Sequence, residues 1–208
     1  TGSKRFGDTN PMTARTSTQS LWIGTEQPAS MTSYDTRIGY AAGKECTGQA
    51  NTFIGRNAGY QYGDSDGTYA VCIGEGAGYS AAGDYGIFVG RIAGYNWAGN
   101  GNATIIGTGA GQDATGHTPT YIGNAAGKSS PAARTTCIGN DAGNAASGDY
   151  AVFIGENAGQ DARALRGVGV GYYALKDASG PDPAVGSQYS MALGNEALYG
   201  TSGEYALG

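Results

Sequence analysis

The amino-acid sequence predicts an all-β fold, a parallel β-solenoid or β-roll of about twelve coils with about 16 residues in each. Three observations predict it. An apolar residue followed by glycine recurs twelve times, mostly 16 residues apart. After two further residues, an Ala-Gly pair follows most of these glycines, and no segment shows the pattern of a helix. A repeat this regular is a structural unit that stacks on its neighbours.

The repeat begins near residue 21 and is most regular between residues 37 and 171. Each glycine closes a short β-prone run, as in TFIG at 52–55 and VFIG at 152–155. At about 4.8 Å per stacked coil, twelve coils predict a rod roughly 55 Å long. The repeat glycines are Gly24, Gly39, Gly55, Gly74, Gly90, Gly107, Gly123, Gly139, Gly155, Gly171, Gly194 and Gly208.

Both faces of each predicted strand are largely apolar. Side chains alternate along a strand, so Thr52 and Ile54 share one face and the residue between them points to the other. A thin solenoid has one interior, so the second face needs a cover, and another copy of the chain is the simplest one. We expect the isoleucine face to fill the coil's own core and the aromatic face to pack on symmetry mates, with the reverse left open. The interface candidates are then Phe53, Cys72, Phe88, Ile105, Tyr121, Cys137 and Phe153.

The Ala-Gly pair fits a tight corner or a close approach of two backbones, where a larger side chain has no room. In the last two full repeats Leu175 and Leu198 replace its glycine. This change predicts a wider cross-section or a different packing partner there. The residue after the pair forms a column in which Tyr60, Tyr79 and Tyr95 alternate with polar residues, and we expect a partly exposed ladder.

The chain divides into two parts. Residues 1–20 are polar and non-periodic, which indicates a linker or the end of a preceding module. Residues 21–208 form the repeat array, with a loop insertion at 177–187 that is rich in glycine and proline. The chain starts without methionine and stops within a repeat, so we expect more protein beyond residue 208.

Composition excludes several classes of function. The formal net charge is −5 and there is no run of lysine or arginine, which disfavours nucleic acid as a partner. No apolar run approaches the length of a membrane span, so we expect no membrane insertion. Cys72 and Cys137 share a column about 19 Å apart, too far for a disulfide, and are expected to be small core residues.

No residue pattern indicates catalysis or a metal site. His117 is the only histidine, and no Cys or His partner stands near it. Glu75 and Glu156 share a column but lie about 24 Å apart, whereas a glycosidase pair needs about 5–9.5 Å. We therefore expect no enzyme, no catalytic residue, no metal and no cofactor. A polysaccharide depolymerase with a carboxylate site shared between chains stays as a second alternative.

Five aromatic residues stand in the connections between coils and look exposed. Aromatic side chains beside polar residues are a usual means of gripping sugars or protein surfaces. The receptor-contact candidates are Tyr62, Tyr69, Tyr85, Trp97 and Tyr150.

An ice-binding solenoid would need ranks of threonine on a flat, exposed face. Thr36, Thr52 and Thr104 share their column with Val71 and Ile87, which predicts that the column is buried.

The phrases TFIGRNAGY at 52–60 and VFIGENAG at 152–159 resemble the repeats of bacteriophage tail fibres and, more distantly, the head repeats of trimeric autotransporter adhesins. The resemblance covers about residues 35–175. It implies a homotrimer in the virion that binds a host cell-surface glycan or protein and contacts other tail proteins. We therefore expect a structural and adhesive tail-fibre segment, with a bacterial adhesin head at the cell surface as the alternative.

Overall fold

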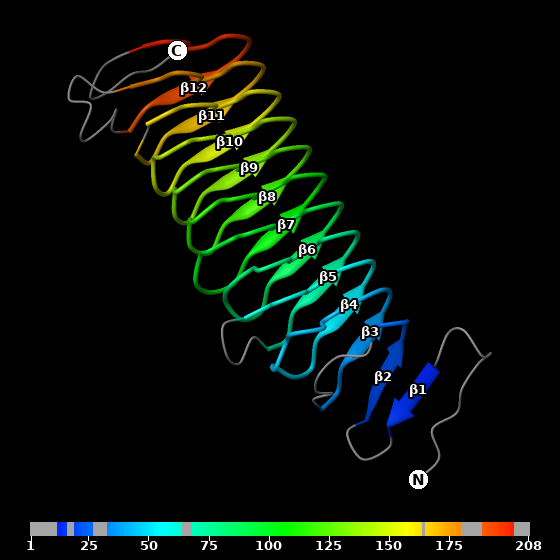
Figure 1. The fold of residues 1–208 in the computed structure, drawn as a ribbon. Helices are drawn as coiled ribbons and strands as arrows, with labels where there is room; N and C mark the ends of the chain where they lie inside the picture. The colour runs from blue at the N-terminus through cyan, green and yellow to red at the C-terminus, as the bar shows by residue number, and fades with distance from the viewer. Residues whose placement is uncertain are drawn as a thin grey trace.

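The computed structural model describes residues 12–15, 19–26, 33–63, 68–163, 165–179 and 189–201. These residues form twelve strands of one sheet, in sequence order, and they contain no helix. It follows that the described part of the chain has no helix long and apolar enough to cross a membrane. In Figure 1 the strands lie side by side like rungs along a rod, with β1 at one end and β12 at the other.

All twelve strands are only three or four residues long, and the eleven from β2 to β12 share one register. The strands are β1 Met12–Arg15, β2 Ser20–Ile23, β3 Thr36–Ile38, β4 Thr52–Ile54, β5 Val71–Ile73, β6 Ile87–Val89, β7 Thr104–Ile106, β8 Thr120–Ile122, β9 Thr136–Ile138, β10 Val152–Ile154, β11 Val168–Val170 and β12 Met191–Leu193. From β2 onward all neighbours are parallel, and like positions pair, as Phe53 with Cys72 does. The result is a parallel β-solenoid with one sheet strand in each coil.

Strand β1 is the exception, because it pairs antiparallel with β2, with Met12 opposite Ile23. It lies within residues 1–20, for which the sequence predicted a linker or the end of a preceding module. An edge strand leaves a row of unpaired backbone groups, and β1 covers that row on β2.

The described solenoid makes about nine turns. The predicted count of twelve coils is not confirmed, because residues 1–11, 27–32 and 202–208 lie outside the described residues. The predicted loop insertion at 177–187 falls mostly on residues 180–188, which also lie outside them.

The middle residue of each short strand points into the coil, and its two neighbours point outward. Burial follows this alternation in β4 and β10, where only the middle residue is buried. All seven residues predicted to lie between chains occupy the middle position, and each is 0% exposed in the single chain: Phe53, Cys72, Phe88, Ile105, Tyr121, Cys137 and Phe153. Their assignment to an interface between chains is therefore wrong, because these side chains fill the coil and the isoleucine face points outward. A three-residue strand places one side chain inside and two outside, and the inner one fills the coil.

The coil is narrow, and this requires glycine at two positions of the repeat, the glycine of Ala-Gly and the repeat glycine. The Phe53 ring lies between Gly43 and Gly59 of successive Ala-Gly pairs, and a Cβ on Gly43 would sit 2.6 Å from that ring. The repeat glycine Gly55 has φ +134°, and a Cβ there would sit 2.5 Å from the carbonyl oxygen of Gly74 in the next coil. A larger side chain has no room at Ala-Gly, as predicted, but the close neighbour is the core side chain rather than a second backbone.

The Leu175 replacement is explained by a reciprocal exchange of size. In β11 the middle position is Gly169, which has no side chain to fill the coil. Leu175, at the glycine position of Ala-Gly, is fully buried and takes that space. A Cβ on Gly169 would lie 3.4 Å from the Leu175 Cβ. Ala192 and Leu198 repeat the exchange in the last described coil, where Leu198 packs against the core.

We expect Leu175→Gly to lower the free energy of unfolding by about 2 kcal/mol. Loss of a buried leucine costs about 2–5 kcal/mol, and relief of the left-handed backbone at Leu175 returns about 1 kcal/mol. Gly169→Ile alone should also destabilise, because the two side chains would then compete for one space. The double variant restores the usual repeat and should be more stable than either single variant in urea denaturation. Additive losses would contradict the exchange.

One coil has an ion pair in its interior. Arg37 takes the middle position of β3, and its Nη2 donates to Asp35 Oδ2 at 2.8 Å, with both side chains 0% exposed. Arg37 Nη1 donates to the carbonyl of Gly43 at 2.6 Å, and Asp35 Oδ1 accepts from the Asn51 backbone N–H at 2.9 Å. The pair is buried with its hydrogen-bond partners, as burial of charge requires.

Arg37→Leu should destabilise the chain by about 3–5 kcal/mol, because it leaves the Asp35 charge buried alone. The double variant Arg37→Leu/Asp35→Ala should recover most of this loss, since alanine stands at the same position in Ala70 and Ala103. Urea denaturation of both variants measures the difference. A single variant within about 1 kcal/mol of the native chain would show that the pair is not held as two buried charges.

Candidate functional site

The outward sheet face is a continuous strip of uncharged side chains. It consists of the first and third residues of the three-residue strands and the matching positions of β2, hereafter the outer sheet face. None of these residues is charged. They are Leu21, Ile23, Thr36, Ile38, Thr52, Ile54, Val71, Ile73, Ile87, Val89, Thr104, Ile106, Thr120, Ile122, Thr136, Ile138, Val152, Ile154, Val168, Val170, Met191 and Leu193.

The outer sheet face is exposed along its length. Ile73, Ile106, Ile138 and Ile154 are each 36–37% exposed, and Leu193 at the last strand is 58% exposed. Eleven parallel strands give a strip about 50 Å long and about 10 Å wide, or about 500 Å². A monomer's largest apolar patch covers about 300–600 Å², so this strip is at the upper end. Two such faces in contact would bury about 1,000 Å², the lower bound of a biological interface.

The threonine column belongs to this face and is only half-buried in the single chain, so the prediction that it is buried is wrong for the coil itself. Thr36, Thr52 and Thr104 are half-buried and point out of the coil, in line with Val71. β-Branched side chains suit any pleated surface on which neighbours pack, whether or not another layer covers it. A column that contains threonine, valine and isoleucine therefore does not indicate whether the column faces the core or the solvent.

Three of the five predicted receptor-contact residues are exposed, and two are not. Tyr69, Tyr85 and Tyr150 are 54%, 55% and 48% exposed. Tyr62 and Trp97 are 0% exposed, so their prediction as exposed residues is wrong. Their rings lie 5.8 Å and 5.7 Å from those of Phe53 and Phe88, inside the coil.

The sequence contains a pattern that indicates the burial of Tyr62 and Trp97. Tyr62 and Trp97 each stand four residues after the alanine of Ala-Gly. The same position holds Ala81, Ala114 and Ala146 in other coils, which are buried. Alignment of the connections by repeat position therefore predicts that both rings lie in the core.

The exposed tyrosines stand in one edge column, two residues before a strand. Tyr69 and Tyr85 stack with ring centroids 5.3 Å apart and planes 4° apart. Further along the column Arg134, Tyr150, Arg166 and Tyr189 alternate, a grouping that the sequence reading did not identify. The backbone is left-handed at these positions, as at Tyr150 with φ 59°, at a cost of about 1–2 kcal/mol each. Left-handed residues occur at other corners too, so this geometry belongs to the coil.

A second ladder follows the Ala-Gly corner and confirms the partly exposed column predicted there. Tyr60, Tyr79 and Tyr95 stack at centroid distances of 5.0 Å and 4.9 Å, and each is half-buried. The hydroxyl of Tyr60 donates to Glu45 at 2.6 Å. This bond lowers the pKa of Glu45 and raises the pKa of Tyr60.

Glu75, Glu156 and His117 lie on different coils of the rod. Glu75 and Glu156 stand in one column, each directly after a repeat glycine, and Glu75 pairs with Arg56 at 3.0 Å. His117 is exposed, and its Nδ1 accepts from the backbone N–H of Asn100 at 2.7 Å. Among the residues that the structure describes, no cluster of three His, Cys, Asp or Glu residues could hold a metal ion.

All three cysteines are free and buried. Desolvation raises the pKa of Cys72 and of Cys137. Both therefore remain thiols at neutral pH and fill space in the core, as the sequence predicted.

Comparisons of this chain with protein-family models, curated proteins and solved structures gave no match. Two features of the chain itself bear on its function. One is the uncharged outer sheet face, and the other is the pair of side-chain ladders at the corners of the coil.

Proposed function

We propose that this chain is a structural and adhesive segment of a homotrimeric fibre, a bacteriophage tail fibre that attaches the virion to a glycan or protein of the host surface. One observation carries the proposal. The rod presents an uncharged sheet face over its described length, while its aromatic and charged ladders stand at the corners. The face would serve assembly and the corners would serve recognition.

The outer sheet face supports assembly from identical chains. Each coil contributes two uncharged outward side chains, as Thr104 and Ile106 do in β7. Copies aligned in parallel would match coil for coil, because every coil advances the rod by the same rise of about 4.8 Å. Pairing would remove isoleucine side chains from water, at about 25 cal/mol per Å² of apolar surface. The number of three chains follows from the resemblance of the repeat to tail fibres.

Stiffness supports a mechanical role. Backbone hydrogen bonds join successive coils at the sheet and also at the corners, where Gly59 N–H donates to Ala77 and Gly78 N–H donates to Ala93, both at 2.8 Å. The rod is thus a continuous ladder rather than a chain of linked domains. A trimer would present each corner residue three times, so weak contacts would add through avidity.

The head of a bacterial trimeric adhesin is the second candidate, because the same face and ladders would serve it equally well. The two candidates differ in where the protein is found. Immunogold labelling with antibody raised against this chain should mark the tails of virions if the first is right. Label on the bacterial envelope without phage would support the second.

Light scattering of the purified chain should give a mass three times 21.0 kDa. Ile106→Lys, which puts a charge in the middle of the outer sheet face, should give monomers at a concentration where the native chain is trimeric. Thr108→Lys is the matched control, because Thr108 is exposed at a corner. Circular dichroism checks that both variants keep the β fold.

A folded native monomer would contradict the trimer. An Ile106→Lys variant that stays trimeric through the same dilution series as the native chain would contradict the outer sheet face as the interface. Equal dissociation of the Thr108→Lys variant would show that the outer sheet face is not the interface.

A further inference from the structure

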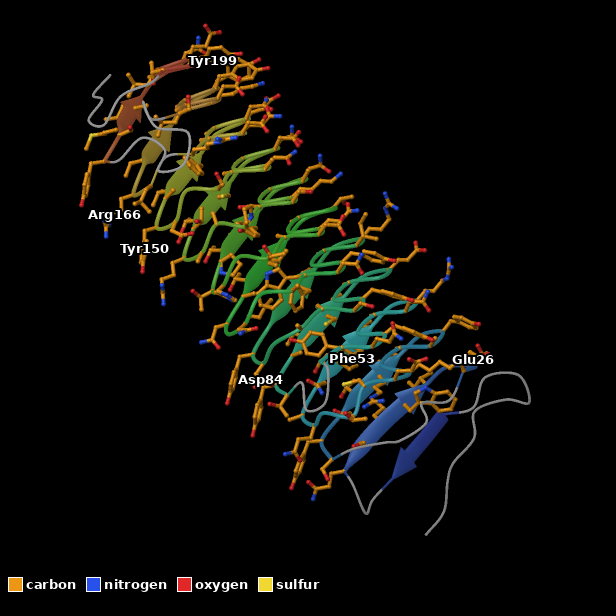
Figure 2. All side chains as sticks on the ribbon, turned by 60° about the vertical axis from the view of Figure 1, so that its left-hand side comes forward. Glu26, Phe53, Asp84, Tyr150, Arg166 and Tyr199 are labelled. Carbon is orange, nitrogen blue, oxygen red and sulfur yellow. The ribbon has the colours of Figure 1, made fainter. Side chains whose placement is uncertain are left out.

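Four side chains of alternating chemistry form one row, hereafter the Arg–Tyr stripe: Arg134, Tyr150, Arg166 and Tyr189. They stand two residues before β9, β10, β11 and β12, on consecutive coils. Figure 2 shows Tyr150 and Arg166 on the same edge of the rod and pointing away from it. The guanidinium carbons of Arg134 and Arg166 lie 5.3 Å and 5.8 Å from the centroid of the Tyr150 ring, and Arg166 also lies 5.3 Å from that of Tyr189.

The stripe is held in place by its own contacts. Arg134 Nη1 donates to the Tyr150 hydroxyl at 2.8 Å, and Arg166 Nη1 donates to the Tyr189 hydroxyl at 2.8 Å. The backbone beneath is also fixed, since Tyr150 N–H donates to the Ala133 carbonyl at 2.9 Å. Each guanidinium has five N–H donors and uses one of them in these bonds. Because the long side chains are ordered in advance, a ligand would not have to order them.

The stripe is a local positive site on an acidic protein. The chain has a formal net charge of −5, yet within the described residues neither Arg134 nor Arg166 forms an ion pair with a carboxylate. The carboxylate of Asp149, next to Tyr150, accepts the backbone N–H of Ala133 at 2.7 Å. Elsewhere in the same column stand Tyr69 and Tyr85, and Asp84 is exposed beside them. The column is therefore cationic only at the stripe.

We propose that the Arg–Tyr stripe binds a linear acidic polysaccharide, and that the arginines contact the carboxylate groups of the polysaccharide. The inference rests on the proposed function, because it names the receptor class of the adhesive fibre. Arginine presents paired donors that match a carboxylate, and the half-exposed tyrosine edges can contact the sugar rings between acid groups. Arg134 and Arg166 lie two coils apart, about 10 Å along the rod, so they form a regular row.

A polysaccharide fits this row better than a nucleic acid does. Binding to nucleic acid depends on neutralising many phosphates with many cations, and the stripe offers two arginines in each chain. A polyuronate needs only a few regularly spaced contacts on each chain. Three parallel stripes in a trimer would multiply them.

The test is binding of the purified trimer to immobilised polygalacturonate and alginate, with neutral dextran as reference, by surface plasmon resonance. The native protein should bind both polyuronates and not dextran. Arg134→Gln/Arg166→Gln should weaken binding by about tenfold or more, since it removes two charge-assisted contacts in each chain. Arg91→Gln is the control for loss of a positive charge outside the stripe, because Arg91 is exposed at another corner. Circular dichroism and light scattering check the fold and mass of each variant.

Several results would overturn the proposal that the Arg–Tyr stripe binds an acidic polysaccharide. They are equal losses in the Arg91→Gln control, equal binding to dextran, binding to single-stranded oligothymidylate as tight as to the polyuronates, or no polyuronate binding by a trimer of correct mass. The last result would leave the fibre proposal intact, because the mass is measured separately. A native monomer would instead overturn the fibre proposal, whatever it binds.

Discussion

The narrow interior of the coil is the constraint on which the rest of the structure depends. The strand of each coil contributes one inward side chain, and the glycines of the neighbouring Ala-Gly pairs lie close to it, while Tyr62 and Trp97 each add a second ring to the interior. Phe53 between Gly43 and Gly59 shows the usual arrangement. The pair Gly169 and Leu175 shows that the space is filled either from the strand or from the corner, but not from both. Alanine and glycine dominate the rest of the cross-section because little volume remains.

The same constraint turns much of the apolar content outward. Three-residue strands with one inward residue must place their other two side chains on the surface, and here these are isoleucine, valine and threonine rather than charged residues. The cost of leaving such a face in water is the physical reason to expect a partner for it. The corners carry few apolar side chains that need a cover, so they present ladders of tyrosine, arginine and amide side chains to solvent.

The sequence allowed prediction of whatever depends on the period. The repeat glycines predicted the strands and their register, and the Ala-Gly pair predicted a position with no room for a larger side chain. The column of Tyr60, Tyr79 and Tyr95 predicted a partly exposed ladder. The strand face that lies inside was predicted wrongly, because both faces are apolar. Tyr62 and Trp97 were misplaced because aromatic residues in glycine-rich connections resemble surface residues. The Arg–Tyr stripe was missed because Arg134 and Arg166 are unremarkable singly and become a group only when residues 16 apart are aligned.

The most direct test of the central claim, that the outer sheet face lies between chains, is site-specific cross-linking. Ile106→Cys places a thiol on that face and Thr108→Cys places one at a corner, while the native cysteines are buried. A short bifunctional maleimide should join two chains of the Ile106→Cys variant covalently and leave the Thr108→Cys variant as single chains on a denaturing gel. Cross-linking of Thr108→Cys in place of Ile106→Cys, or of neither, would contradict the account.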